Sequence, residues 1–185
     1  AHPAPSAASA LPLSGITVLD LTRLLPGPMA TLHLADMGAT VIKIEDKGAG
    51  DYARTMSHVR HELSQLFIAV NRGKDLLRLD LKDKDDHAQF LQMVETADVV
   101  VESFRPGVMD RLGFGYQAVR AINPKVVYGS VTGYGTEGPW VDLPGQDLLA
   151  QARSGMMWLT GGAQDGPVAV GLPIGDVLAG AALAH

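Results

Sequence analysis

The fold is decided by residues 16–44, which run ITVLDLTRLLPGPMATLHLADMGATVIKI. The first six, Ile16–Leu21, are apolar and β-branched and predict a buried strand. The Pro-Gly-Pro that follows suits a first helical turn, so we expect a helix over residues 29–37 that ends at Gly38. Ala39–Ile44 predicts the next strand. A strand, a helix and a strand in so short a stretch form a βαβ unit with a right-handed crossover.

The alternation of helix and strand continues along the chain. We expect these further elements: helices over 83–96, 108–112, 116–122, 146–157 and 176–185, and strands over 97–102 and 126–131. The predicted fold class is therefore α/β, with a Rossmann-like, mostly parallel sheet and helices on both faces. Residues 1–12 are expected to be a flexible leader. The Ala-rich residues 179–184 need another element to pack against, so we expect the chain to be part of something longer.

Composition excludes several classes of protein. The chain has 185 residues, of which 46% are hydrophobic and 19% charged, so it is an ordinary globular sequence. Its formal net charge of −5 disfavours a nucleic-acid partner. It has no cysteine, which removes disulfides and thiolate zinc sites and favours the cytoplasm. No apolar run approaches the ~20 residues that cross a bilayer, so no membrane partner is expected.

Candidate functional residues lie where the predicted strands end. A dinucleotide site is disfavoured because residues 24–28 contain one glycine where the fingerprint needs three. Basic residues near these ends form either a phosphate site or an ordinary solvated surface. The six histidines show no metal-ligand spacing, so no metal is expected. Asp176 precedes an apolar helical stretch, where it is either a functional carboxylate or a helix N-cap.

The motifs together resemble the class III CoA-transferases, the CaiB/BaiF family. The segments that show the resemblance are Leu13–Arg23, Gly27-Pro28, Leu34–Glu45, Gly50-Asp51, Asn71–Lys74, Leu79–Lys82, Ala97–Gly107, Asn123-Pro124, Gly133–Gly135, Gly138-Pro139, Pro144-Gly145 and Gly175-Asp176. They occur in order over nearly all of residues 13–185. The resemblance implies that 13–185 is the N-terminal part of a CoA-binding large domain, that a small domain is absent, and that the complete enzyme is a homodimer of interlocked subunits.

The resemblance also implies a chemistry and its residues. Family members transfer CoA between an acyl-CoA and a carboxylic acid through an aspartate, which corresponds to Asp176. CoA itself is a substrate, and no bound cofactor is implied. The implied CoA-binding positions are Leu25, Pro26, Lys47, Leu79, Lys82, Ser103, Phe104, Arg105, Arg111 and Gln146. An arginine of the family pattern is replaced here by Asp46, so Lys47 would have to contact phosphate in its place.

Two alternatives to CoA transfer stay open. The racemase branch of the family has a proton-transferring histidine at the position of Gln146, and glutamine cannot titrate near neutral pH. This difference favours transfer over racemase or isomerase activity. The chain could also be a truncated, non-catalytic CoA-binding remnant. Asp147 is interpreted as a structural partner rather than a second catalytic group.

Overall fold

The computed structural model describes residues 11–56, 58–60 and 63–185. Its centre is a five-stranded sheet in the order β5-β2-β1-β6-β7, and every neighbouring pair is parallel. The strands are β1 (Thr17–Leu21), β2 (Thr40–Glu45), β5 (Asp75–Arg78), β6 (Val99–Glu102) and β7 (Val127–Ser130). The α/β prediction is confirmed. The predicted leader over residues 1–12 lies, except for residues 11 and 12, outside the described residues.

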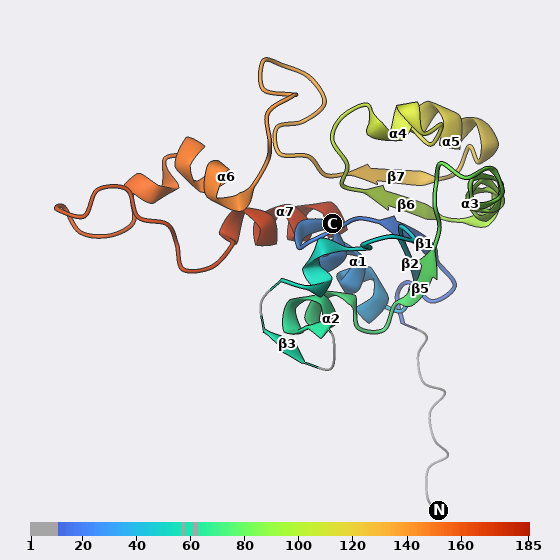
Figure 1. Ribbon diagram of the computed structural model, residues 1–185, viewed down its shortest axis with the longest axis horizontal. Helices are drawn as coiled ribbons and strands as arrows, with labels where there is room; N and C mark the ends of the chain where they lie inside the picture. Colours follow the sequence, from blue (N-terminus) through green and yellow to red (C-terminus); the bar gives the residue numbers. More distant parts are fainter. Residues whose placement is uncertain (1–10, 57, 61–62) are drawn as a thin grey trace, which may run out of the picture.

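Helices cover both faces of the sheet (Figure 1). One face has α1 (Pro26–Asp36) and α7 (Ile174–Ala184), with α2 (Gln65–Asn71) packed against α1. The other face has α3 (Lys84–Thr96), α4 (Val108–Arg111) and α5 (Tyr116–Ile122). No helix in the described part of the chain is long and apolar enough to cross a membrane.

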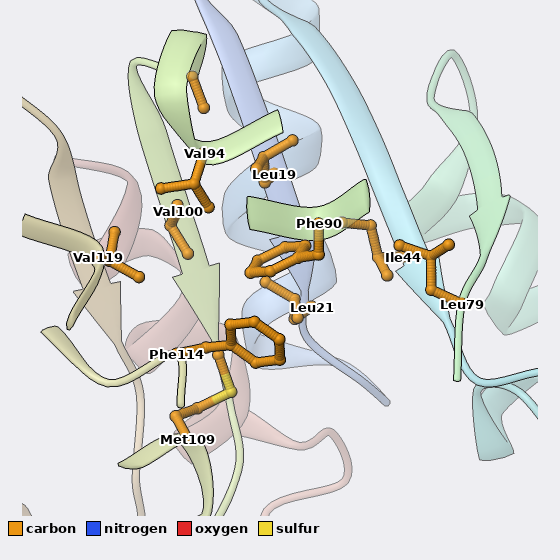
Figure 2. Packing of buried hydrophobic residues seen from close by; sticks show 11 residues of the cluster. Leu19, Leu21, Ile44, Leu79, Phe90, Val94, Val100, Met109, Phe114 and Val119 are labelled. Carbon is orange, nitrogen blue, oxygen red and sulfur yellow. The ribbon is translucent and has the colours of Figure 1, made fainter. Parts of the chain in front are cut away.

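The larger of two hydrophobic clusters lies between the sheet and α3–α5. Figure 2 shows Leu19 and Leu21 of β1 facing Phe90 of α3. Phe90 meets Phe114 edge to face, with ring centroids 4.6 Å apart. The smaller cluster, on the α1 and α7 face, includes Val18, Val41 and Val101. The alternation of faces along each strand places neighbouring residues of β1 in opposite clusters, which fixes the register of the sheet.

The helix α1 begins earlier than its apolar pattern indicated. It starts at Pro26 instead of residue 29, because proline at the first position needs no N–H partner and its φ already suits a helix. It ends as predicted, with Gly38 at a φ of +102° directly after the last turn. The early start places the first turn of α1 directly beside the carboxyl end of β1.

One other prediction differs from the structure, and the strand β5 was not predicted. The helix expected over 146–157 is α6 (Asp147–Arg153), which stops before Gly155 at a φ of +79°, and a short 3-10 turn, η2 (Met156–Trp158), follows it. The sequence also gave no sign of β5, an edge strand whose residues are mostly exposed. Further elements are η1 (Tyr52–Arg54) and the antiparallel pair β3 (Val59–Arg60) and β4 (Leu63–Ser64).

Candidate functional site

The carboxyl edge of the sheet contains the switch point of its topology. From β1 the chain crosses through α1 to β2 on one side, whereas β6 lies on the other side of β1. The loops that leave β1 and β6 therefore diverge, and open α/β sheets bind ligands in the crevice between such loops. In this chain the crevice lies between residues 22–25 and residues 103–107.

A cleft of about 790 Å³ opens at this edge, on the face that α3–α5 cover. Its walls come from the ends of three strands and from α4, and include Leu21, Arg23, Ile44, Asp46, Lys47, Leu79, Lys82, Phe104, Arg111 and Leu112. The volume is within the range of ~300–1,000 Å³ typical of small-molecule sites. Of the ten predicted CoA-binding residues, the cleft brings together Lys47, Leu79, Lys82, Phe104 and Arg111.

The cations of the cleft differ in their partners. Lys47 Nζ lies 2.6 Å from a carboxylate oxygen of Asp86, and the Arg23 guanidinium lies 3.1 Å from that of Asp46. Among the described residues, Lys82 and Arg111 form no salt bridge. They are the two positive groups that remain available to a phosphate.

Arg23 is a cleft residue to which the sequence analysis gave no role. Its guanidinium lies 5.2 Å from the centre of the Phe104 ring and 5.7 Å from that of Tyr52. The same guanidinium forms the ion pair with Asp46, so the Asp46 carboxylate is neutralised by Arg23 and does not repel a phosphate in the cleft. The replacement of an arginine by Asp46 is the sequence signal that could have drawn attention to Arg23.

Phe104 is held in the cleft wall by the end of β6. The buried Glu102 carboxylate accepts a hydrogen bond from the Phe104 N–H at 2.7 Å and another from the Ser130 hydroxyl. Burial raises the pKa of Glu102, against the effect of these two hydrogen bonds. The polar end of the strand thus fixes the turn that directs the aromatic ring into the cleft.

The other five predicted CoA-binding residues lie outside the cleft lining. Leu25 and Pro26 form the start of α1, and Ser103 Oγ accepts a hydrogen bond from the Arg23 N–H at 3.0 Å. Arg105 is exposed on the turn before α4, and Gln146 is exposed at the start of α6. The structure therefore places Ser103 as a support of the loop after β1, and it places Gln146 apart from the cleft.

Asp176 lies in the first turn of α7. It is the third residue of the helix, half-buried, and the cap position is occupied by Pro173, so Asp176 is not the N-cap that one interpretation allowed. Burial, and then the charge of Asp147, raise the pKa of Asp176 above its usual value of 3.8. Asp176 is therefore a carboxylate that its surroundings solvate poorly.

Asp147 supports the turn that contains Asp176. Its Oδ1 accepts hydrogen bonds from the N–H of Gly175 at 2.7 Å and of Asp176 at 3.3 Å, and its Oδ2 accepts one from Gln151 at 2.7 Å. These bonds occupy backbone donors at the start of α7 that the helix itself cannot satisfy. Asp147 thus forms structural contacts with the turn that contains Asp176, whereas the sequence analysis gave it a structural role without naming a partner.

The helix α7 brings Asp176 to the same edge of the sheet as the cleft. Gly180 lies so close to α1 that an added Cβ would be 2.6 Å from the Pro26 carbonyl oxygen. One turn farther toward the start of α7, about 6 Å along its axis, is Asp176. It therefore lies beyond the first turn of α1, whereas the cleft opens on the opposite face. The loops after β1 and β6 separate the two.

Comparison with known proteins identifies the family of the chain. The sequence pattern of CoA-transferase family III matches residues 13–185. The chain belongs to this family. Its curated relatives include the acetyl-CoA:oxalate CoA-transferase of Acetobacter aceti, 48% identical over 160 residues, which are 86% of this chain and 41% of that protein. The human succinyl-CoA:glutarate CoA-transferase is 40% identical over 171 residues, 91% of this chain and 39% of the relative.

The fold of family III is also seen in solved structures. A crystal structure of a CaiB/BaiF family protein from Brucella suis superimposes with a TM-score of 0.90 at 34% identity, over 95% of this chain and 47% of that one. The chain thus spans less than half the length of the relatives it matches. The fold and the family are established for this segment, and family III proteins act on CoA thioesters.

Proposed function

We propose that this chain supplies the CoA-binding site and the nucleophile of an enzyme that transfers CoA from an acyl-CoA to a carboxylic acid. The observation that supports it most directly is the Asp176 carboxylate, half-buried beside Asp147 at the edge of the sheet that also contains the cationic cleft. A poorly solvated carboxylate is a better nucleophile than one in water. The names of its relatives indicate oxalate, succinate and glutarate as the class of acids.

The nucleotide end of CoA is proposed to bind in the cleft. Lys82 and Arg111 contact its phosphates, and Leu79 and Phe104 contact the base. The pantetheine arm then passes the loop after β1, along Leu25 and Pro26, and brings the thioester to Asp176. Residues 13–185 would thus form the CoA-binding part of the complete enzyme, which we expect to be a cytoplasmic homodimer.

The proposed reaction proceeds by four exchanges at carbonyl carbons. The Asp176 carboxylate attacks the thioester, so that a C–O bond forms, the C–S bond breaks and CoA thiolate leaves an acyl–aspartyl anhydride. The thiolate attacks the Asp176 carbonyl and releases the donor acid, which leaves an aspartyl-CoA thioester. The acceptor carboxylate displaces the thiolate from this thioester, and the thiolate then attacks the acceptor acyl group. Asp176 is regenerated as a carboxylate, and no net proton is consumed.

The test is trapping of the covalent intermediate in the complete natural protein. The enzyme is mixed with acetyl-, succinyl- or oxalyl-CoA, quenched with hydroxylamine and analysed by intact and peptide mass spectrometry. We expect a hydroxamate on Asp176, none in Asp176→Asn, and an undiminished yield in Asp142→Asn, which alters an exposed aspartate in the loop before α6. Binding of CoA without any adduct would contradict the proposal and favour a CoA-binding module.

A further inference from the structure

The loop between β1 and α1 contains an unusual backbone conformation at Leu24. Its φ is +68°, and among the described residues it is the one non-glycine residue with a positive φ. A residue with a Cβ rarely adopts this left-handed conformation unless its surroundings enforce it. Leu24 immediately precedes Leu25 and Pro26 at the start of α1, where the Pro26 carbonyl oxygen faces Gly180 of α7.

Asp51, in the loop after β2, stabilises this conformation of Leu24 through its side-chain carboxylate. The side chain is buried, and its Oδ1 accepts hydrogen bonds from the N–H of Leu24 at 3.0 Å and of Ala53 at 2.9 Å. Its Oδ2 lies 2.9 Å from the ammonium of Lys43, which is also buried. Lys43 in turn donates to the carbonyl oxygen of Thr22 at 2.9 Å. The Asp51–Lys43 pair therefore binds one N–H and one C=O of the same short loop.

A second buried ion pair holds the first turn of α1, which directly follows the loop. Lys74 Nζ lies 3.0 Å from Asp20 Oδ2 and donates to the carbonyl oxygen of Pro28 at 2.8 Å. Between the two ion pairs, the Pro26 carbonyl faces Gly180 of α7. The backbone at residues 22–28 is thus held at both ends by buried lysines, with the first turn of α1 pressed against the helix that contains Asp176.

We propose that Asp51 is a positioning residue for the transfer reaction. Together with Lys43 it holds Leu24 in the left-handed conformation, and it thereby sets where Leu25 and Pro26 lie relative to the Asp176 carboxylate. The inference rests on the proposed function. A buried ion pair is often no more stabilising than apolar residues of the same volume. Apolar residues, however, could not bind the N–H of Leu24 and the C=O of Thr22, so the pair is explained by the geometry that it imposes.

The test separates positioning from stability by two different rescues. Asp51→Asn weakens the hydrogen bond that the residue accepts from the Leu24 N–H, and it leaves the Lys43 charge buried without a carboxylate partner. We expect kcat to fall about tenfold to hundredfold, as for a displacement near 1 Å at a reacting group, while the Kd for CoA changes by less than about threefold. Adding Leu24→Gly, which adopts a positive φ without strain, should recover a large part of kcat. Adding Lys43→Met should recover thermal stability but not kcat.

The measurements are steady-state transfer, calorimetric CoA binding and thermal unfolding of the complete natural protein. Asp36→Asn, which breaks an exposed ion pair with Arg72, is the matched control and should change none of them. Wild-type kcat in a folded Asp51→Asn enzyme would overturn the inference. So would recovery of kcat by Lys43→Met but not by Leu24→Gly, which would make Asp51 purely structural. Absence of transfer by the wild-type enzyme would instead overturn the proposed function, and this inference with it.

Discussion

The packing of α7 against α1 depends on the missing side chain of Gly180, and Gly180→Ala tests how far this contact sets the position of Asp176. A methyl group at residue 180 would lie 2.6 Å from the Pro26 carbonyl oxygen and 2.8 Å from Met29 Cε. The end of a methionine side chain can move, but the Pro26 carbonyl belongs to the backbone of α1. Carbon and carbonyl oxygen atoms usually approach to about 3.3 Å. The two helices must therefore separate by roughly 0.7 Å.

The separation has a cost that the alanine offsets in part. Overpacking of this kind costs ~1–3 kcal/mol, and replacing a glycine inside a helix by alanine stabilises the helix by ~1 kcal/mol. We expect the free energy of unfolding to fall by about 1 kcal/mol, measured by urea denaturation. The control is Gly171→Ala, whose added methyl group meets no atom within 4 Å. Equal stability of the two variants would show that α7 does not press on α1 as described.

The same separation should reduce activity more than ligand binding. Asp176 lies one turn from Gly180, so a shift of this size at the contact displaces the carboxylate relative to the thioester, and we expect kcat to fall about tenfold. The cleft opens on the opposite face of the sheet, so the Kd for CoA should stay within about threefold. A variant that loses stability but keeps its kcat would refute the reasoning that the α1–α7 contact positions Asp176.

Three further outcomes are expected. Replacing Arg111 by alanine should weaken CoA binding about tenfold or more, the scale of a hydrogen bond to a charged group, whereas Arg120→Ala outside the cleft should not; calorimetry decides. Because its raised pKa disfavours the charged form of Asp176, Asp176→Asn should raise the free energy of unfolding by roughly 0.3–1 kcal/mol at neutral pH. This gain should disappear as the pH falls below about 4, where both folded and unfolded states are protonated. Burial lowers the pKa of Lys74 to about 8, so the carbon-13 NMR signal of its side chain should titrate near that pH. The free energy of unfolding should rise between pH 8 and 10.5, because in that range the unfolded chain still binds the proton that the folded protein has lost. A titration of Lys74 near pH 10 would contradict the described burial.

Much of the fold could be predicted because local signals and tertiary structure agree. The β-branched runs that form β1, β2 and β6 are buried on both faces, so their apolar character is continuous and easily recognised. The edge strand β5 gave no signal, because a mostly exposed Asp-Leu-Leu-Arg segment needs few apolar residues. The missing signal at β5 and the overlong helix at 146–157 have the same cause. Both depend on neighbours in space, which a local pattern does not contain.

The site was predicted only as far as the motifs extend. The resemblance indicated five residues of the cleft and Asp176, but not the contacts between loops that hold them. Lys43 was the available signal, since a lysine within an apolar strand must find a partner when it is buried. The partner of Lys43, Asp51, lies on another loop and could not be recognised from a local pattern.

Asp20 is the second buried aspartate of this region. Burial alone would favour the neutral form of the Asp20 carboxyl group. The charges of Lys74 and Lys43 and the hydrogen bonds from Thr22 and Thr31 nevertheless lower the pKa of Asp20.

The carboxyl edge of the sheet contains buried ion pairs, although apolar residues of similar volume would make it as stable. Two lysines and two aspartates occupy the interior directly beneath the loop after β1. Each lysine forms an ion pair with an aspartate and donates to a backbone carbonyl oxygen, Lys43 to that of Thr22 in the loop and Lys74 to that of Pro28 in the first turn of α1. Substitution of one member of a pair would leave the opposite charge buried and uncompensated, so single substitutions at these four positions should be strongly destabilising. A loop held in this way is positioned before any ligand binds. The proposed transfer needs such positioning, because an anhydride on Asp176 would be hydrolysed if the CoA thiolate were too loosely placed to attack it first.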